Sequence, residues 1–223
     1  WISVRKFDFS AYPPHVALEA RSYAWKPIVV AEVLDEFQVP VLWLDSATVA
    51  TSDLSEPFRI MAKHGAVSLK GKPPLGEHCD PRVLQELDVA SELLHLPERV
   101  AGVVGFDPTH KVARDLANSW ARHALIESHI MPPEAMANHK PEQAVLSALL
   151  YKAQSEGLIT LNQDEVDISS GWPVNWLTTR NKVWPWLPRL ADPLVRLYYK
   201  TYKTADQFNH RFRNWEKRRI GGT

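Results

Sequence analysis

The sequence has little cysteine, little glycine and no net charge, and each scarcity narrows the possible classes of protein. The single cysteine, Cys79, cannot form an internal disulfide, so a secreted disulfide framework is excluded. No apolar run reaches the length of a membrane-spanning helix, about 18 residues. Walker A, G-x-S-x-G, Rossmann glycine and H-E-x-x-H motifs are all missing. Of the 223 residues, 45% are hydrophobic and 23% are charged, a composition typical of a globular protein.

The neutral total charge hides an uneven distribution. From residue 194 to the end, eight Lys or Arg residues face only Asp206 and Glu216, so this tail is basic and the remainder acidic. Such a tail can contact a membrane surface, or it can be a helix packed on the acidic body. One leucine and five aromatic residues at helical spacing favour packing; they are Leu197, Tyr198, Tyr202, Phe208, Phe212 and Trp215. No nucleic-acid partner is expected.

Strand-like and helix-like segments alternate along the first 160 residues, and this alternation predicts a three-layer α/β domain. The expected strands cover 2–7, 41–44, 66–69, 100–106 and 158–161, and the expected helices 25–38, 53–65, 81–94, 109–126 and 142–154. The Gly- and Pro-rich segment 70–81 is expected to be a loop.

The stretch 23–48 carries the clearest chemical signal. An apolar helix containing Lys26 precedes the continuous apolar run 41–44, which predicts a strand covered on both faces in a parallel or mixed sheet. Asp45 follows at its carboxyl end, where ligands bind in open α/β sheets. There it can hold a divalent cation or a sugar hydroxyl; alternatively, it caps the next turn. Lys26 can likewise be a ligand-binding residue or a solvated helix lysine.

Two later segments complete a pattern. Residues 99–107 read RVAGVVGFD, and residues 138–147 read NHKPEQAVLS. Together with Y-x-W-K-P and W-L-D-S, they resemble in order three segments of GT-A-fold glycosyltransferases, which use nucleotide sugars and include glycogenin and galactinol synthase. The segments Y-x-W-K-P and W-L-D-S resemble more closely a group of eukaryotic glycosyltransferase-like proteins. That group is defined only by a domain of unknown function. The resemblance spans residues 7–152 and implies a GT-A-like three-layer mixed sheet flanked by helices.

The resemblance also implies roles for particular residues. Asp45, with Ser46 beside it, would bind the donor and a Mn or Mg ion, and Lys26 would offset charge on the diphosphate or the sugar. Gly102 would let the backbone approach the sugar closely. Glu142 would be the catalytic acidic residue, although its place after Pro141 equally suits a simple helix-start carboxylate. Nearby hydrogen bonds would come from two further side chains, His139 and Gln143.

The sequence departs from the family in ways that leave a second hypothesis open. Asp45-Ser46-Ala47 lacks the second carboxylate of D-x-D, and Glu142 replaces the family's Asp. The first hypothesis is an active glycosyltransferase with a carbohydrate or protein acceptor. The alternative is therefore a catalytically inactive domain that binds carbohydrate or protein. About 22 residues precede the lysine helix, fewer than the roughly 30 of one βαβ unit, so either an amino-terminal unit is missing or the domain is a pared-down relative.

The domain organisation follows from these assignments. Residues 1–193 are expected to form the glycosyltransferase-like domain and residues 194–223 the basic helical tail. If the resemblance holds, the protein works in the lumen of the Golgi or of another part of the secretory pathway.

Overall fold

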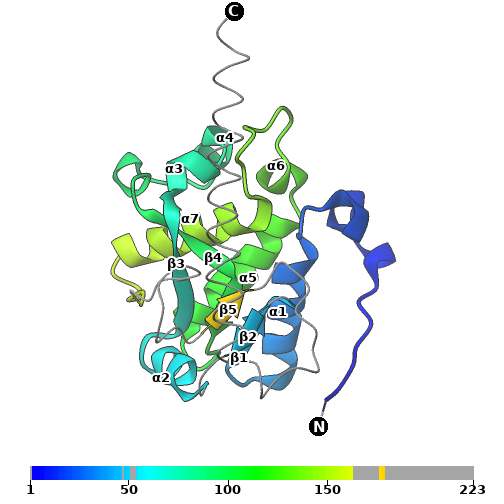
Figure 1. The fold of residues 1–223 in the computed structure, drawn as a ribbon, viewed down its shortest axis with the longest axis vertical. Coiled ribbons are helices and arrows are strands. Elements are labelled where there is room, and N and C mark those ends of the chain that lie inside the picture. Colours follow the sequence, from blue (N-terminus) through cyan, green and yellow to red (C-terminus); the bar gives the residue numbers. More distant parts are fainter. Residues whose placement is uncertain (1, 47, 51–53, 163–175, 179–223) are drawn as a thin grey trace, which may run out of the picture.

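The computed structural model describes residues 2–46, 48–50, 54–162 and 176–178, which form an α/β fold (Figure 1). The strands are β1 (Val41–Leu44), β2 (Thr48–Ala50), β3 (Ala66–Pro74), β4 (Pro97–Phe106) and β5 (Trp176–Thr178). The α-helices are α1 (Trp25–Phe37), α2 (Ser55–His64), α3 (Leu75–His78), α4 (Pro81–Glu86), α5 (Lys111–Ala124), α6 (Glu127–Ile130) and α7 (Pro141–Ser155). Short 3₁₀ helices are η1 (Phe9–Ala11), η2 (Pro14–Val16), η3 (Leu18–Ala20) and η4 (Ser91–Leu93).

The larger sheet has the strand order β1-β4-β3, and both of its pairings are antiparallel. A second, two-stranded sheet pairs β2 with β5, again antiparallel. The mixed sheet expected from the sequence is therefore not formed by the described residues. The apolar run 41–44 did predict coverage on both faces correctly, because Val41 and Trp43 pack against the main core and Leu42 and Leu44 against smaller clusters on the other face.

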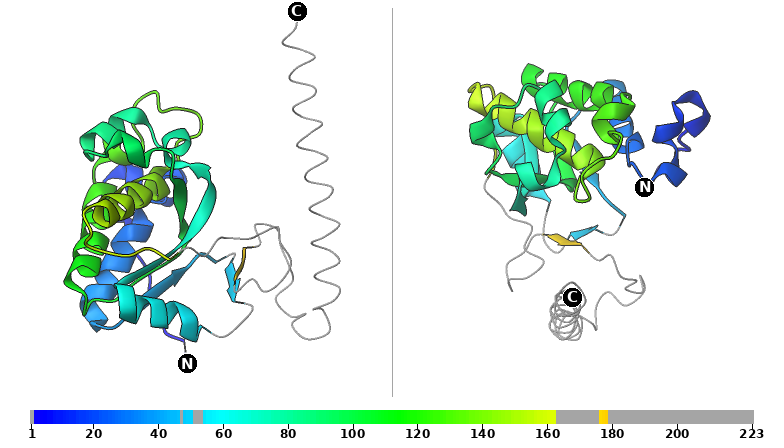
Figure 2. Two further views of the ribbon diagram at one scale, coloured as in Figure 1. Left: turned by 90° about the vertical axis from the view of Figure 1, so that its left-hand side faces the viewer. Right: turned by 90° about the horizontal axis from the view of Figure 1, so that it is seen from above.

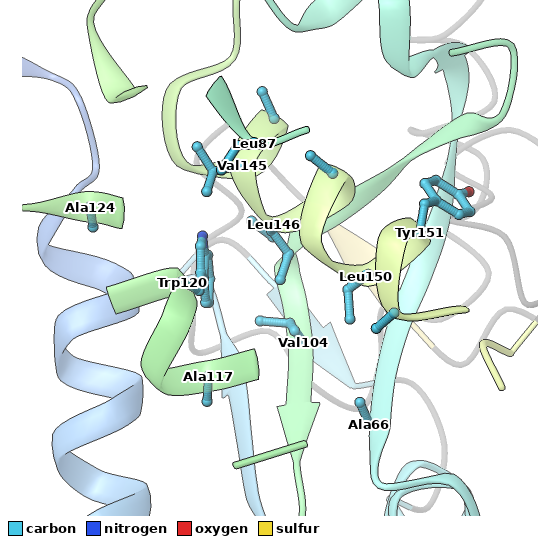
Figure 3. Packing of buried hydrophobic residues seen from close by; sticks show 14 of the residues in the cluster. Ala66, Leu87, Val104, Ala117, Trp120, Ala124, Val145, Leu146, Leu150 and Tyr151 are labelled. Carbon is cyan, nitrogen blue, oxygen red and sulfur yellow. The ribbon is translucent and has the colours of Figure 1, made fainter. Parts of the chain in front are cut away.

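Helices cover the larger sheet mainly on one side. Figure 2 shows α1, α5 and α7 gathered on that side, with the β2–β5 pair on the other. The core between helices and sheet is built around Trp120 of α5, which packs with Val104 of β4 and Leu146 of α7 (Figure 3). On the opposite face, Met61 of α2 fills the space over Gly105, where a Cβ would lie 2.5 Å from its sulfur. No described helix has the length and apolar character needed to cross a bilayer.

Local sequence explains why α1 stops where β1 can begin. Gln38 adopts a left-handed conformation (φ 53°) and its N–H bonds the carbonyl of Leu34, which closes the helix. Val39 and Pro40 then leave the helix, because the residue before proline disfavours helical geometry. Similarly, Pro141 occupies the first turn of α7, where its missing N–H costs no hydrogen bond. The end of α1 lets β1 run up to Asp45, and the start of α7 positions Glu142.

Several predicted elements are wrong in detail. Residues 2–7 are extended but pair with no described strand, and 158–161 form no strand. The predicted helix 81–94 breaks into α4 and η4, because Asp88 turns left-handed (φ 52°). The expected loop 70–81 instead continues β3 and adds α3. The predicted tail helix, residues 194–219, lies outside the described residues.

Candidate functional site

The ammonium group of Lys26 lies at the centre of a cluster drawn from α1, β1, β4 and α7. Its Nζ is 2.9 Å from Oε1 of Glu142 and 3.0 Å from Oδ1 of Asp45. A longer contact of 3.4 Å runs to the carbonyl of Ala101. Lys26 and Glu142 are 116 residues apart in sequence, so the fold creates this cluster. We call Lys26, Asp45 and Glu142 the Lys26 cluster.

Asp45 is the member of the cluster that reaches solvent. It follows the last residue of β1, and its N–H donates to the carbonyl of Gly102 (2.9 Å). Oδ1 accepts from Lys26 and from the indole N–H of Trp43 (2.7 Å). The side chain remains 42% exposed, whereas that of Lys26 is 4% exposed. The carboxylate is thus oriented by two donors on one oxygen and remains partly accessible to a ligand.

Glu142 occupies the buried end. It lies in the first turn of α7 and its side chain is 7% exposed. Its backbone carbonyl accepts the indole N–H of Trp120 at 2.8 Å, which ties the start of α7 to the core of α5. Since Glu142 contacts Lys26 and not solvent, its most direct effect is to hold the ammonium. The catalytic role expected for it stays a prediction.

The charges of the cluster are tightly coupled. Burial acts to lower the pKa of Lys26, but Glu142 and Asp45 outweigh it, and the pKa is raised. Burial raises the pKa of Glu142, against the opposing effect of Lys26. The raised pKa favours the protonated form of Lys26, which is not a nucleophile. Whether Glu142 is ionised or protonated, the three residues carry no net positive charge.

This balance bears on the role expected of Lys26. The ammonium lies 2.9 Å from Glu142 and 3.0 Å from Asp45, and it holds the side chain of Asp45 relative to α7. The expected role of Lys26, to offset charge on the diphosphate or the sugar, stays a prediction.

Gly102 and Gln143 support the cluster from β4 and α7. Register between β3 and β4 shifts here, since Ser68 pairs with Val104 but Leu69 pairs with Val100. Ala101 lies within this shift; its N–H donates to Oε1 of Gln143 at 3.2 Å. A Cβ on Gly102 would lie 3.2 Å from Oδ2 of Asp45, so the missing side chain makes room for the carboxylate. The close approach of a sugar, expected for Gly102, stays a prediction.

Two predicted site residues have other surroundings. Nδ1 of His139 accepts the N–H of Asp80, and Nε2 donates to the carbonyl of Ile130, so both nitrogens are used in the α4–α6 region. Burial lowers the pKa of His139, consistent with a neutral structural histidine. Ser46 is exposed in the turn after Asp45, with no contact to the cluster among the described interactions. The expected role of His139 in the cluster is therefore wrong.

The Mn or Mg ion expected at Asp45 stays a prediction. Oδ1 of Asp45 already accepts from Lys26 and Trp43, so Oδ2 is the oxygen that such an ion would use. Within the described part of the chain, no three His, Cys, Asp or Glu side chains are arranged to hold a metal.

Sequence reasoning missed two aromatic residues at the cluster. Trp43 donates to Asp45, and the alternation of side chains along a strand could have found it, since residues 43 and 45 share a face. Tyr23, just before α1, places its ring centroid 5.7 Å from Nζ of Lys26. Its orientation could not be predicted, because a residue outside a predicted helix has no periodicity that assigns its side chain to one face.

Comparison with protein-family models, with curated proteins and with solved structures gives no significant match for this chain.

Proposed function

We propose that this chain is a GT-A-like glycosyltransferase domain that binds the sugar of a nucleotide-sugar donor at the Lys26 cluster. One observation carries the proposal: Lys26 and Asp45 come from the segment 23–48 and Glu142 from the segment 138–147, and both carboxylates lie within 3.0 Å of the Lys26 ammonium. Their order along the chain also matches the order of the corresponding segments in the family that the sequence resembles.

The chemistry of glycosyl transfer suits a carboxylate placed like Asp45. The bond from the anomeric carbon to the diphosphate breaks, the acceptor oxygen bonds to that carbon, and the proton of the acceptor hydroxyl goes to the departing diphosphate. The sugar is oxocarbenium-like while these bonds exchange. A fixed negative charge beside the sugar stabilises that state. Oδ2 of Asp45 is free of the Lys26 and Trp43 contacts and can also accept a sugar hydroxyl. The proposal assigns Lys26 and Glu142 to holding Asp45 in place.

A second candidate, a carbohydrate-binding domain without transfer activity, is favoured by the burial of Glu142. A catalytic acid must reach its substrate, and a side chain that is 7% exposed and bound to Lys26 does not. In this alternative, Asp45 binds the sugar and no bond is broken.

A donor-consumption assay tests the proposal. The protein is incubated with a panel of uridine- and guanosine-diphosphate sugars and mixed saccharide acceptors, and release of the nucleoside diphosphate is measured. We expect turnover with at least one donor, and at least a tenfold loss in Asp45→Asn, about 1.4 kcal/mol of transition-state stabilisation.

The matched control is Asp35→Asn, since Asp35 is an exposed aspartate of α1 paired with Arg114 at 3.1 Å, and its turnover should be unchanged. Turnover that is insensitive to Asp45 would contradict the proposed site. No turnover, together with sugar binding that depends on Asp45, would establish the binding domain instead.

A further inference from the structure

Tyr23 has an unusual backbone for an aromatic residue. Its φ of 54° lies in the left-handed region, which bulky side chains rarely occupy. Arg21, two residues earlier, is also left-handed (φ 55°). Such conformations cost free energy and persist where the surrounding structure enforces them. Despite this cost, the turn leaves the Tyr23 side chain 49% exposed instead of burying it.

The turn is held by buried contacts on either side of it. Ser22 lies between the two left-handed residues and is fully buried. Its hydroxyl donates to the carbonyl of His15 and accepts the N–H of Ala24 at 3.2 Å. The carbonyl of Tyr23 itself accepts the N–H of Lys26 at 3.0 Å, at the start of α1. The backbone of Tyr23 is thus fixed relative to Lys26.

Tyr23 and Asp45 are the two partly exposed neighbours of the Lys26 ammonium among its described contacts. The ring centroid of Tyr23 is 5.7 Å from Nζ, and Oδ1 of Asp45 is 3.0 Å from it. Both residues are partly exposed, at 49% and 42%. The other neighbours of the ammonium, Glu142 and the carbonyl of Ala101, belong to buried residues. A molecule that approaches the cluster from solvent therefore meets the ring of Tyr23 and the carboxylate of Asp45.

A half-exposed aromatic ring beside a carboxylate is chemically suited to a sugar. The face of an aromatic ring is negative and attracts the weakly positive C–H groups on one face of a pyranose. A carboxylate accepts the hydroxyl groups at the sugar's edge. The cluster carries no net positive charge, which disfavours direct binding of a phosphate. We infer that Tyr23 and Asp45 form a subsite for a neutral pyranose ring, with Tyr23 as its stacking platform; this inference rests on the proposed function.

Saturation-transfer NMR tests this inference directly. The probes are uridine diphosphate glucose, uridine diphosphate galactose, uridine diphosphate and the methyl glucosides, each added to the full chain. The variants are Tyr23→Gly, which suits the left-handed backbone but removes the ring, and Tyr23→Phe, which keeps the ring. Arg21→Gly is the matched control, because it makes the same backbone change two residues away and retains Tyr23.

In the native protein we expect saturation of the pyranose C–H protons by at least one sugar-containing probe. Tyr23→Gly should bind that probe at least about tenfold more weakly, while Tyr23→Phe and Arg21→Gly should bind it like the native protein. The melting temperature of each variant shows whether it is folded, and Tyr23→Leu provides a second ring-less variant if Tyr23→Gly does not fold.

Three results would overturn the inference: no saturation of any sugar proton, saturation confined to the nucleotide, or equal binding by a folded ring-less variant. Failure of the proposed function is distinguishable from these. If no donor is consumed but sugar binding depends on Tyr23, the transferase proposal fails and the sugar subsite stands.

Discussion

Replacing Lys26 by methionine should destabilise the protein strongly, because it leaves a buried carboxylate without its partner. Methionine resembles the lysine stem in shape, so the change removes mainly the ammonium. Glu142 is 5% exposed, and its described ion pair is the 2.9 Å contact with Lys26. Removing one partner of a buried ion pair typically costs about 3–5 kcal/mol. We expect a loss within this range, a large part of the total stability of a domain.

The cost should depend on pH in a defined direction. Burial already raises the pKa of Glu142, and loss of the Lys26 charge raises it further. A carboxyl whose pKa is higher in the folded than in the unfolded protein favours folding at low pH, and this contribution is lost as pH rises through the folded-state value. The deficit of Lys26→Met relative to the native protein should therefore shrink as pH falls below neutrality. Protonation of the orphaned Glu142 is the cause.

Urea denaturation of four proteins measures both effects: native, Lys26→Met, Glu142→Gln and the double variant. Glu142→Gln should cost less than Lys26→Met, since Lys26 keeps Asp45 at 3.0 Å. The double variant should recover at least half of the Lys26→Met loss, because no charge remains buried without a partner. A loss below about 1 kcal/mol in Lys26→Met, or no recovery in the double variant, would refute the reasoning.

Three further variants test the supporting contacts. Gly102→Ala places a Cβ 3.2 Å from Oδ2 of Asp45 and should weaken sugar binding several-fold in titrations, with a stability cost of only about 1 kcal/mol; unchanged binding would show that Asp45 has room to move. Trp43→Phe removes the 2.7 Å bond to Asp45 and should lower the free energy of unfolding by about 1 kcal/mol more in native protein than in Asp45→Ala, measured as a double-mutant cycle. Arg99→Met should cost about 3 kcal/mol or more in urea denaturation, because the buried guanidinium donates to the hydroxyl of Tyr151 and the carbonyl of Ser68, both at 3.1 Å. A decrease of less than about 1 kcal/mol in the free energy of unfolding would mean that these acceptors form hydrogen bonds with water in the variant.

Much of the helix and strand pattern could be predicted from local sequence. The apolar run 41–44, the breaks at Val39–Pro40 and Pro141 and the amphipathic pattern of α5 each act within a few residues, and the structure follows them. Strand pairing could not be predicted in this way. An apolar run has the same sequence pattern whether the neighbouring strand is parallel or antiparallel, provided that both faces of the run are covered. Separate clusters cover the two faces of β1, and its described partner β4 is antiparallel.

The candidate site, like the fold, could be predicted from the sequence only in part. Motif positions correctly brought Lys26, Asp45 and Glu142 together, because each motif fixes one side chain near a strand end or helix start. Spacing alone could not assign the roles, since those depend on which charges neutralise each other after folding. The sequence pattern did not indicate that two carboxylates would lie on the ammonium of Lys26. The His139 prediction failed because its partners, Asp80 and Ile130, lie in other elements.

The most direct test of the proposed site is thermal denaturation of the native protein and of Asp45→Asn with a panel of nucleotide sugars. A ligand that binds the folded state stabilises it, by about 2.7 kcal/mol at a concentration of 100 Kd. At least one nucleotide sugar should raise the melting temperature of the native protein, and Asp45→Asn should lose most of that rise while Asp35→Asn keeps it. If no nucleotide sugar raises the melting temperature, or if Asp45→Asn responds like the native protein, the Lys26 cluster is not a nucleotide-sugar site.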